Sequence, residues 1–304
     1  MEECNTSRLR STRVWLALAF VTAAFFFTDA TEAALYRPIV HALHLHRSAH
    51  NTLGQGTYGT LMAVRLFWTG LIWLLLCRVL SQSPLSFPLF AKRLVRYMVI
   101  GLGTGFSVML FTMLGIWALR SATVGVSGQS VLSAAGNGCL WLALEFAGAL
   151  GEELWGRAIV LVVTQRLLGW RGAMLISGLM FSALHLSNHG ATWIWLLRLF
   201  LQGVLLAYAV FRTGSLWWSV GYHTAWNWVS APLFGAVGSG YVDEGHIFNF
   251  YPRGSVWVTG GSAGPEGSIL SFVAVLAAFG LILYTTKNDP QNPSLWKRLM
   301  PESL

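Results

Sequence analysis

The chain has 304 residues, of which 55% are hydrophobic types and only 11% are charged. A soluble domain carries roughly 25% charged residues, so the composition excludes an ordinary soluble protein and indicates a polytopic integral membrane protein. The three cysteines, Cys4, Cys77 and Cys139, are far apart and form no CxxC pair, which argues against a disulfide framework or a thiolate metal site. The net charge of +8 could indicate a nucleic-acid partner, and the positions of the basic residues test this.

Eight apolar stretches approach the roughly 20 residues that a helix needs to cross a bilayer. In chain order they cover residues 14–35, 58–80, 94–119, 131–168, 172–186, 193–211, 215–237 and 268–285. The fourth is about twice the length of a span, and it is either a long tilted helix or a loop followed by a helix that begins near Cys139. The fifth is short. These stretches predict an all-α transmembrane helix bundle of about eight spans.

Basic residues fall unevenly on the two sides of this bundle. With the N-terminus inside, the inner side collects thirteen: Arg8, Arg10, Arg13, Arg78, Lys92, Arg93, Arg96, Arg166, Arg171, Arg212, Lys287, Lys297 and Arg298. The outer side collects four: Arg37, Arg47, Arg120 and Arg253. The remaining Arg65, Arg157 and Arg198 lie within spans. This positive-inside bias predicts that both termini are cytoplasmic, in a cell (inner) membrane. The charge suits anionic lipid headgroups, and no nucleic-acid partner is expected.

The N-terminal arginines and the apolar run that follows are similar to a signal peptide. No convincing small-residue cleavage site precedes Asp29 and Glu32, so we expect an uncleaved first helix. Residues 238–267 predict a polar outer loop rich in Gly and aromatic residues. Three histidines of the first outer loop are either solvated or metal-binding: His41, His44 and His46.

Several polar side chains occur inside the predicted spans, where each ionisable group costs several kcal/mol and therefore indicates function. The fourth stretch contains Glu145, Glu152, Glu153 and Arg157, the fifth contains His185, and the seventh contains His223 and Asn227. No other predicted span carries so dense a set. We therefore expect these side chains to form a functional site within the membrane.

Helical spacing organises this set. Glu153 and Arg157 are four residues apart and face each other across one turn, so Arg157 can neutralise one carboxylate of the Glu152–Glu153 pair. Two adjacent carboxylates in a low dielectric do not ionise together easily, and one of them can then take up a proton near neutral pH, as a general base must. His223 and Asn227 are also four apart, and such a pair can donate hydrogen bonds to a developing oxyanion.

Depth in the membrane gives an independent comparison. Measured from the nearest inner-side arginine, Glu152 and His185 each lie fourteen residues along the helix and His223 lies eleven. At about 1.5 Å per residue these are depths of roughly 21, 21 and 17 Å, so three helices can bring their polar residues to one site. Phe181 lies one turn before His185 and should pack beside it.

Each of these features alone has a structural alternative. The Glu153–Arg157 pair could be a buried ion pair without a catalytic role. His185, His223 and Asn227 could each form hydrogen bonds that join helices. Taken together at matching depth, the residues favour a functional site.

Three motifs in this region have a recognisable order. Glu152–Arg157 fits EExxxR, Phe181–His185 fits FxxxH, and His223–Asn227 fits HxxxN. In this order and spacing they resemble the CPBP intramembrane proteases (Abi domain). That family includes the Ras-converting CAAX prenyl endoproteases such as CAAX prenyl protease 2, lysostaphin-resistance protein A, and bacteriocin-processing or immunity proteins. The resemblance covers about residues 140–229, and the run 260–267 also looks like bacterial members.

The resemblance implies a helical bundle with an intramembrane polar cavity and a hydrolase that cuts peptides. Carried over by motif, Glu152 with His185 would activate water, and His223 with Asn227 would stabilise the oxyanion. Glu153 and Arg157 would support the first motif. The cofactor is either one zinc ion, held by Glu152, His185 and His223, or none.

The expected organisation has three parts. Residues 1–130 form N-terminal transmembrane helices, residues 131–237 form the CPBP-like catalytic core, and residues 238–304 form an outer loop, a last transmembrane helix and a cytoplasmic tail. The expected partners are membrane lipid and a peptide or protein substrate, in the CAAX case a lipidated one. Two other functions remain open: a proton-coupled transporter or channel that uses the same Glu/His cluster, and a non-catalytic immunity-type membrane protein.

Overall fold

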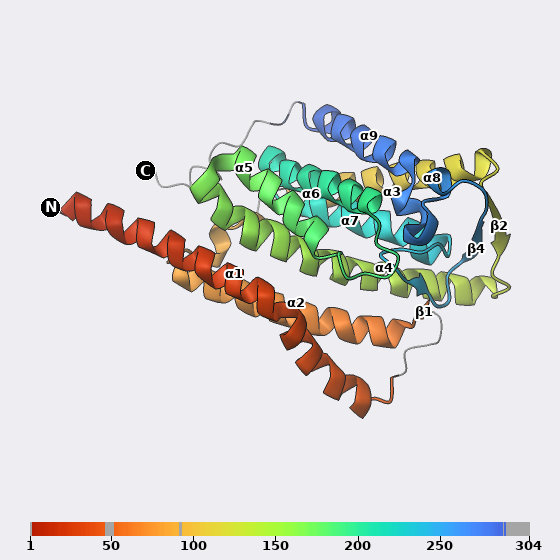
Figure 1. Cartoon of the computed structure of the whole chain (residues 1–304), viewed down its shortest axis with the longest axis horizontal. Helices are drawn as coiled ribbons and strands as arrows, with labels where there is room; N and C mark the ends of the chain where they lie inside the picture. Colours follow the sequence, from red (N-terminus) through yellow and green to blue (C-terminus); the bar gives the residue numbers. More distant parts are fainter. Residues whose placement is uncertain (1, 46–51, 91–92, 288, 290–304) are drawn as a thin grey trace.

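The computed structural model describes residues 2–45, 52–90, 93–287 and 289, with side chains from Thr12 onward (Figure 1). Some residues used in the sequence analysis lie outside this part, namely His46, Arg47, Lys92, Lys297 and Arg298. The long helices are α1 (Glu2–Ala42), α2 (Gln55–Val79), α3 (Leu94–Ala118), α4 (Val131–Glu153), α5 (Leu161–Ala183), α6 (Trp193–Thr213), α7 (Trp217–Trp228) and α9 (Ile269–Thr285). The predicted all-α fold is confirmed for the described residues.

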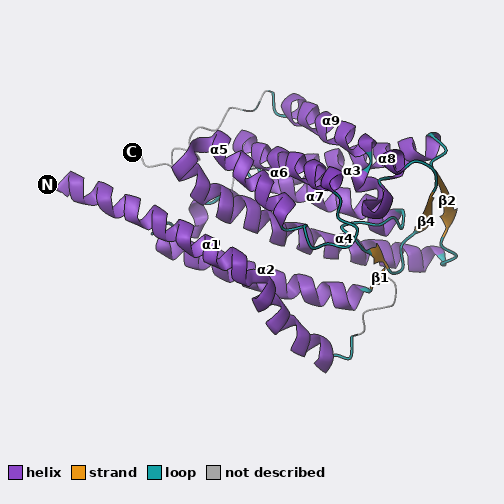
Figure 2. Ribbon diagram, viewed as in Figure 1, coloured by secondary structure: helices purple, strands orange, loops and turns teal. Residues whose placement is uncertain are grey.

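Shorter elements connect these helices. They are a short helix α8 (Val256–Thr259), π-helical segments Leu154–Val160 and Val229–Leu233, and 3-10 turns Pro84–Ser86, Pro88–Phe90 and Gly261–Gly267. Two small sheets lie at one end of the bundle (Figure 2). In one, β1 (Thr52–Leu53) pairs in parallel with β3 (Val242–Asp243), and in the other β2 (Ala122–Val126) pairs antiparallel with β4 (Phe248–Pro252). The sequence analysis expected only a loop over residues 238–267, so the strands in it are a correction.

Six helices of the described chain are long and apolar enough to cross a membrane. They are Thr12–Ala42, Gln55–Val79, Leu94–Ala118, Val131–Ala183, Trp193–Thr213 and Gly261–Thr285. The difference from about eight expected spans has two sources. The fourth and fifth stretches form one helical run that turns back at Gly169 (φ 66°, ψ 178°), and the seventh is represented by α7, which has only 12 residues. The long fourth stretch is therefore a continuous helix and not a loop plus a helix.

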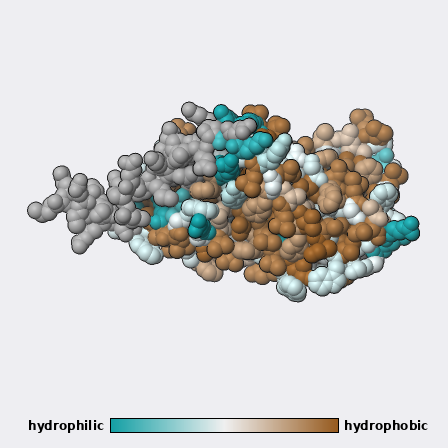
Figure 3. Space-filling model, turned by 90° about the horizontal axis from the view of Figure 1, so that it is seen from above, coloured by the Kyte–Doolittle hydropathy of each residue, from teal (hydrophilic) through white to brown (hydrophobic). Residues whose placement is uncertain are grey.

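The outer surface is that of a membrane protein. Large apolar side chains such as Phe26, Phe67, Phe111 and Leu276 are more than half exposed, and hydrophobic residues cover much of the face seen in Figure 3. A soluble protein rarely exposes apolar patches of this extent. The chain is therefore an integral membrane protein, in which lipid covers these side chains.

Helix α7 is the centre of the bundle and packs against α3, α4 and α6. Its close approach to α3 requires glycine, because a Cβ atom on Gly105 would lie 2.2 Å from the carbonyl oxygen of Tyr222 and one on Gly101 would lie 2.2 Å from that of Trp218. Small residues allow membrane helices to approach in this way. Helices α1 and α2 pack on the other side of α4 (Figure 1). This arrangement places α4 between α2 and α7, where its polar residues become buried.

Candidate active site

Three helices bring one carboxylate and two imidazoles together. Glu152 lies near the end of α4, His185 lies in the turn after α5, and His223 lies in the middle of α7. The Oε2 atom of Glu152 is 3.9 Å from Nε2 of His185 and 3.9 Å from Nε2 of His223. The structure therefore brings these three side chains together, as their matching depths predicted.

The π-helical segment Leu154–Val160 begins directly after the two glutamates. A π-helical turn is wider than an α-helical one and occurs often at functional sites. The two glutamates before this segment differ in exposure. The Glu152 side chain is 21% exposed, whereas the Glu153 side chain is completely buried. Adjacent residues on one helix point in different directions, so only Glu152 reaches the cavity.

Glu153 joins Arg157 to His223. Its Oε1 atom accepts a hydrogen bond from Arg157 Nη1 at 3.1 Å and lies 3.0 Å from His223 Nδ1. The Arg157 guanidinium is completely buried, lies 4.8 Å from the centre of the Phe181 ring, and donates from Nη2 to the Gly203 carbonyl oxygen at 3.2 Å. The expected i,i+4 pair is present, and it also fixes the imidazole of His223.

Both imidazoles present Nε2 to Glu152. His185 Nδ1 lies 2.8 Å from the Phe181 carbonyl oxygen, which can only accept, so Nδ1 carries the hydrogen. The Phe181 ring lies 5.1 Å from the His185 ring and 5.6 Å from the His223 ring. The expected packing of Phe181 beside His185 is confirmed, and the same ring also packs against His223.

Arg65 of α2 was not assigned a role from the sequence, yet it contacts the central carboxylate. Its Nη1 atom lies 3.4 Å from Glu152 Oε1 and its Nε atom lies 3.3 Å from Glu32 Oε2 of α1. Each glutamate of the adjacent pair therefore has an arginine of its own, Arg157 for Glu153 and Arg65 for Glu152. The position of Arg65 within a predicted span was a signal of function. Spacing could not identify Glu152 as its partner, because the two residues lie on different helices.

Asn227 makes a contact that differs from the one expected. Its Nδ2 atom donates to Glu145 Oε2 at 3.1 Å, and the Tyr58 hydroxyl donates to the same oxygen at 3.3 Å. One hydrogen of the amide is thereby used by Glu145, and Asn227 also lines the cavity. Glu145 was noted in the sequence, but its partners on α2 and α7 were not predicted.

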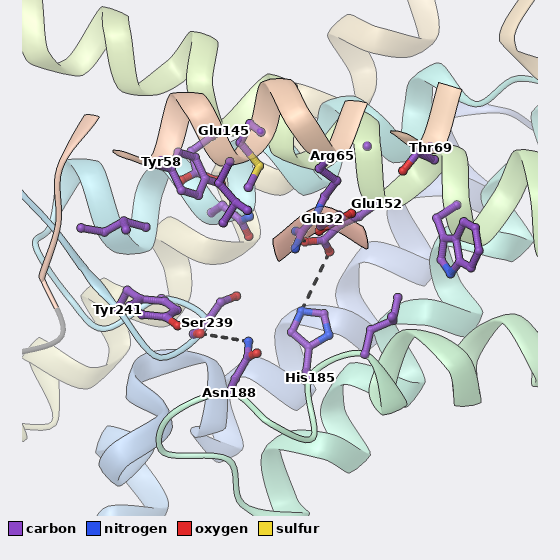
Figure 4. Close-up of a pocket in the computed structure, with 18 of the residues that line it drawn as sticks. Glu32, Tyr58, Arg65, Thr69, Glu145, Glu152, His185, Asn188, Ser239 and Tyr241 are labelled. Atoms are coloured by element: carbon purple, nitrogen blue, oxygen red, sulfur yellow. Dashed lines mark hydrogen bonds and ion pairs between the residues drawn. The ribbon is translucent and has the colours of Figure 1, made fainter. Parts of the chain in front are cut away.

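A cavity of about 210 Å³ connects these groups. Figure 4 shows Glu152 and His185 facing each other across it, with Arg65 and Glu32 beside the carboxylate. Farther along lie Tyr58, Glu145, Ser239 and Tyr241. Thr69 lies on the opposite side of Glu152 from Tyr58 (Figure 4), and Trp155 also lines the cavity. The predicted intramembrane polar cavity is therefore present.

A second buried ion pair, Arg198–Glu266, was not predicted from the sequence and lies next to the site. Glu266 accepts from Arg198 Nη2 at 2.9 Å, from Trp195 Nε1 at 3.0 Å and from Trp226 Nε1 at 3.0 Å. The Trp195 ring lies 5.7 Å from His185 in an edge-to-face arrangement. The run 260–267, expected in a loop, thus delivers a carboxylate that connects α6 and α7 near the histidines.

His41 and His44 do not belong to this site. Helix α1 continues to Ala42, beyond the predicted end of the first span at residue 35. His41 therefore lies on the last turn of a helix and not in a loop, and both histidines are exposed.

The donor set of Glu152, His185 and His223 fits zinc in its chemistry, because carboxylate oxygen and imidazole nitrogen are zinc ligands. The Nδ1 contacts of both rings also match the outer-shell hydrogen bonds of metal-binding histidines. A tetrahedral zinc with bonds of about 2.0–2.1 Å holds its ligand atoms roughly 3.3 Å apart, and the observed separations of 3.9 Å are wider. Among the described residues no group of three or more His, Cys, Asp or Glu is arranged to hold a metal ion.

Comparison with known proteins adds an independent finding. Residues 134–229 match the family model described as Type II CAAX prenyl endopeptidase Rce1-like. No curated protein and no solved structure matches the chain. The matched part contains Glu152, His185, His223 and Asn227 and is a domain of this family, which confirms the resemblance inferred from the three motifs. A domain of this family implies a peptidase that acts on protein substrates.

Proposed function

We propose that the chain is an intramembrane endopeptidase that hydrolyses peptide bonds with water activated by Glu152 and His185. The observation that supports it most directly is the state of Glu152 Oε2. This atom is buried, has no hydrogen-bond partner among the described residues, and lies 3.9 Å from two imidazole nitrogens. A buried acceptor of this kind is costly unless something donates to it.

The separation of 3.9 Å between Glu152 Oε2 and His185 Nε2 is too long for a direct hydrogen bond and suits a water molecule about 2.8 Å from both atoms. Since His185 Nδ1 carries a hydrogen, Nε2 of the neutral ring accepts one. Water placed there donates to the carboxylate and to the imidazole, which leaves an oxygen lone pair for attack on a carbonyl carbon. Glu152 then holds the proton and delivers it to the leaving amine.

The oxyanion would form beside His223 and Asn227. His223 is held by Glu153 through Nδ1 at 3.0 Å, and as an imidazolium it donates from Nε2 as well. Asn227 contributes the amide hydrogen that Glu145 does not use. Donors held in place before reaction stabilise the developing charge without reorganisation. Glu153 and Arg157 act through His223 by fixing its ring and balancing its charge.

The substrate would be a peptide segment that reaches the cavity from the membrane. The family description refers to CAAX prenyl peptides, so processing of a lipidated C-terminus is one form of this activity. The positive-inside distribution of basic residues supports an orientation with both termini cytoplasmic in the cell (inner) membrane. Membrane lipid then borders the cavity through α1, which contributes Thr28, Asp29 and Glu32 to the lining.

Purified protein in detergent tests the proposal with two peptide sets, one prenylated and one unmodified. Glu152→Gln and His223→Ala should each lower the cleavage rate by about 10²–10⁴-fold, the usual contribution of an acid–base group. His41→Ala, at an exposed position outside the site, is the matched control and should retain the rate. Absence of cleavage in both sets, together with proton flux that depends on Glu152, would refute the proposal and favour a transporter.

A further inference from the structure

Helices α2 and α4 carry polar residues at the same spacing of seven. Tyr58 of α2 contacts Glu145 of α4 at 3.3 Å, and Arg65 of α2 contacts Glu152 of α4 at 3.4 Å. Seven residues advance a helix by about 10.5 Å. Glu145 is thus a second carboxylate in the same cavity, roughly 10 Å from the proposed catalytic one and on the side of Tyr58 and Tyr241 (Figure 4).

A carboxylate from a distant part of the chain joins Glu145. Asp243 lies in β3, which is held against β1 by the pairing of Asp243 with Leu53. It lines the cavity, it is only 4% exposed, and its Oδ2 atom has no hydrogen-bond partner among the described residues. Burial and the neighbouring Glu145 charge raise the pKa of Asp243 well above its usual range. No Lys, Arg or His of the described residues forms an ion pair with this carboxylate.

The arginine that lines the cavity is already paired with other carboxylates. Arg65 is the only Lys or Arg among the described residues that line it, and its guanidinium is occupied by Glu32 and Glu152. Among the described residues, Glu145 receives hydrogen bonds from two neutral groups, Tyr58 and Asn227. Carboxylates that are buried without a cation are costly, so their presence beside the reaction centre points to a ligand that carries the missing charge.

We propose that Glu145 and Asp243 form a subsite for a positively charged group of the substrate peptide, an ammonium or guanidinium. This inference rests on the proposed peptidase function and names the substrate class. The Tyr58 and Tyr241 rings at the same end of the cavity suit the role, because aromatic faces attract cations. A buried carboxylate paired with a cation is a strong and selective contact, so the subsite would select basic substrates over neutral ones.

The distance between the subsite and Glu152 sets the position of the basic residue. An extended peptide advances about 3.3 Å per residue, so roughly 10 Å corresponds to about three residues. The favoured substrate therefore carries Lys or Arg about three positions from the bond that is cut. A free N-terminal amine at the same distance offers the same chemistry, and the experiment separates the two sources.

Binding is measured in the full-length Glu152→Gln protein in detergent, so that no turnover is required. Fluorescence anisotropy follows dansyl-labelled, amidated hexapeptides in three forms: N-acetylated with one Lys, N-acetylated with norleucine in place of that Lys, and norleucine with a free amine. We expect about tenfold tighter binding of the Lys peptide than of its norleucine match, as a hydrogen bond to a charged group contributes. Tighter binding of the free-amine form instead would assign the subsite to an N-terminus.

Asp243→Asn, and independently Glu145→Gln, should reduce the preference to within about twofold, as expected when a charged hydrogen bond becomes a neutral one. Glu244→Gln removes the neighbouring exposed carboxylate, which does not line the cavity, and should keep the full preference. If Asp243→Asn does not fold, Glu145→Gln provides the same test. Equal affinity for Lys and norleucine peptides, or a preference unchanged in the folded cavity variant, overturns the subsite.

Protein with native Glu152 then links the two proposals. A peptide series with Lys moved along the chain should be cut about three residues from the Lys. Cleavage without charge preference would refute the subsite and leave the peptidase proposal standing. Charge-selective binding without cleavage of any peptide would refute the peptidase proposal and leave the subsite standing.

Discussion

Glu152 and Glu153 are adjacent, and the same isosteric change to glutamine should have opposite consequences at the two positions. The Glu153 side chain and its partner Arg157 are both completely buried. The Glu152 side chain is 21% exposed to the cavity, and its partner Arg65 is 29% exposed. The pair therefore compares a carboxylate that holds the fold together with one that is available for chemistry.

The expected magnitudes follow from these environments. Glu153→Gln leaves the buried Arg157 cation without its counter-charge, and breaking a buried pair by removing one partner costs about 3–5 kcal/mol. It also removes the charge that faces His223 Nδ1 at 3.0 Å. Glu152→Gln breaks a longer and partly solvated contact of 3.4 Å, for which about 0–1 kcal/mol is typical. The first change should therefore lower the free energy of unfolding strongly. The second should lower it little while it reduces the cleavage rate by about 10²–10⁴-fold.

Thermal unfolding in detergent, followed by tryptophan fluorescence, measures the stability of both variants, and peptide cleavage at a temperature where both are folded measures activity. A loss of stability in Glu152→Gln as large as that in Glu153→Gln would refute the reasoning. So would a Glu153→Gln protein as stable as the parent, because the Arg157 charge would then be balanced by something other than Glu153.

Three further outcomes are expected. Gly105→Ala should lower the unfolding temperature, because its Cβ would lie 2.2 Å from the Tyr222 carbonyl oxygen. Gly103→Ala on the same helix meets nothing within 4 Å and should leave the unfolding temperature unchanged. Equal effects of the two changes in the same assay would contradict this account of the α3–α7 contact. Because the pKa of Asp243 is raised from its ordinary value of 3.8, the folded protein binds that proton more tightly than the unfolded chain, and stability falls as pH rises through the window above 3.8. Asp243→Asn should therefore gain unfolding temperature relative to the parent as the pH is raised above 3.8, and a constant difference would be the contrary result. Peptide cleavage should survive exhaustive chelation with elemental analysis showing no bound zinc, since the side chains are spaced too widely for that ion; loss of activity that zinc restores would overturn this.

Helical periodicity made several features of the site predictable. Residues four apart on one helix must share a face, so the Glu153–Arg157 pair follows from spacing alone. The cost of burying charge in a membrane singled out Glu152, His185 and His223, and their common distance from inner-side arginines placed them at one depth. These are local properties, and the sequence contains them in full.

Partners on other helices depended on the tertiary structure. Nothing in the spacing of α2 shows that Arg65 meets Glu152, or that Tyr58 meets Glu145, because periodicity specifies a face and not what lies opposite it. Asp243 and Glu266 were harder still, since both occur in a segment that reads as a polar loop but folds back into the bundle.

Sequence alone thus determined the membrane embedding, the helical class and the identity of the central polar residues, because composition, length and periodicity are local. Only the packing of α1, α2 and the 238–267 segment against α4 and α7 decided which charges are balanced. Among the described residues, it left the carboxylates of Glu145 and Asp243 without a Lys or Arg partner in the cavity that Glu152 shares, because contacts between distant segments arise only when the chain is folded.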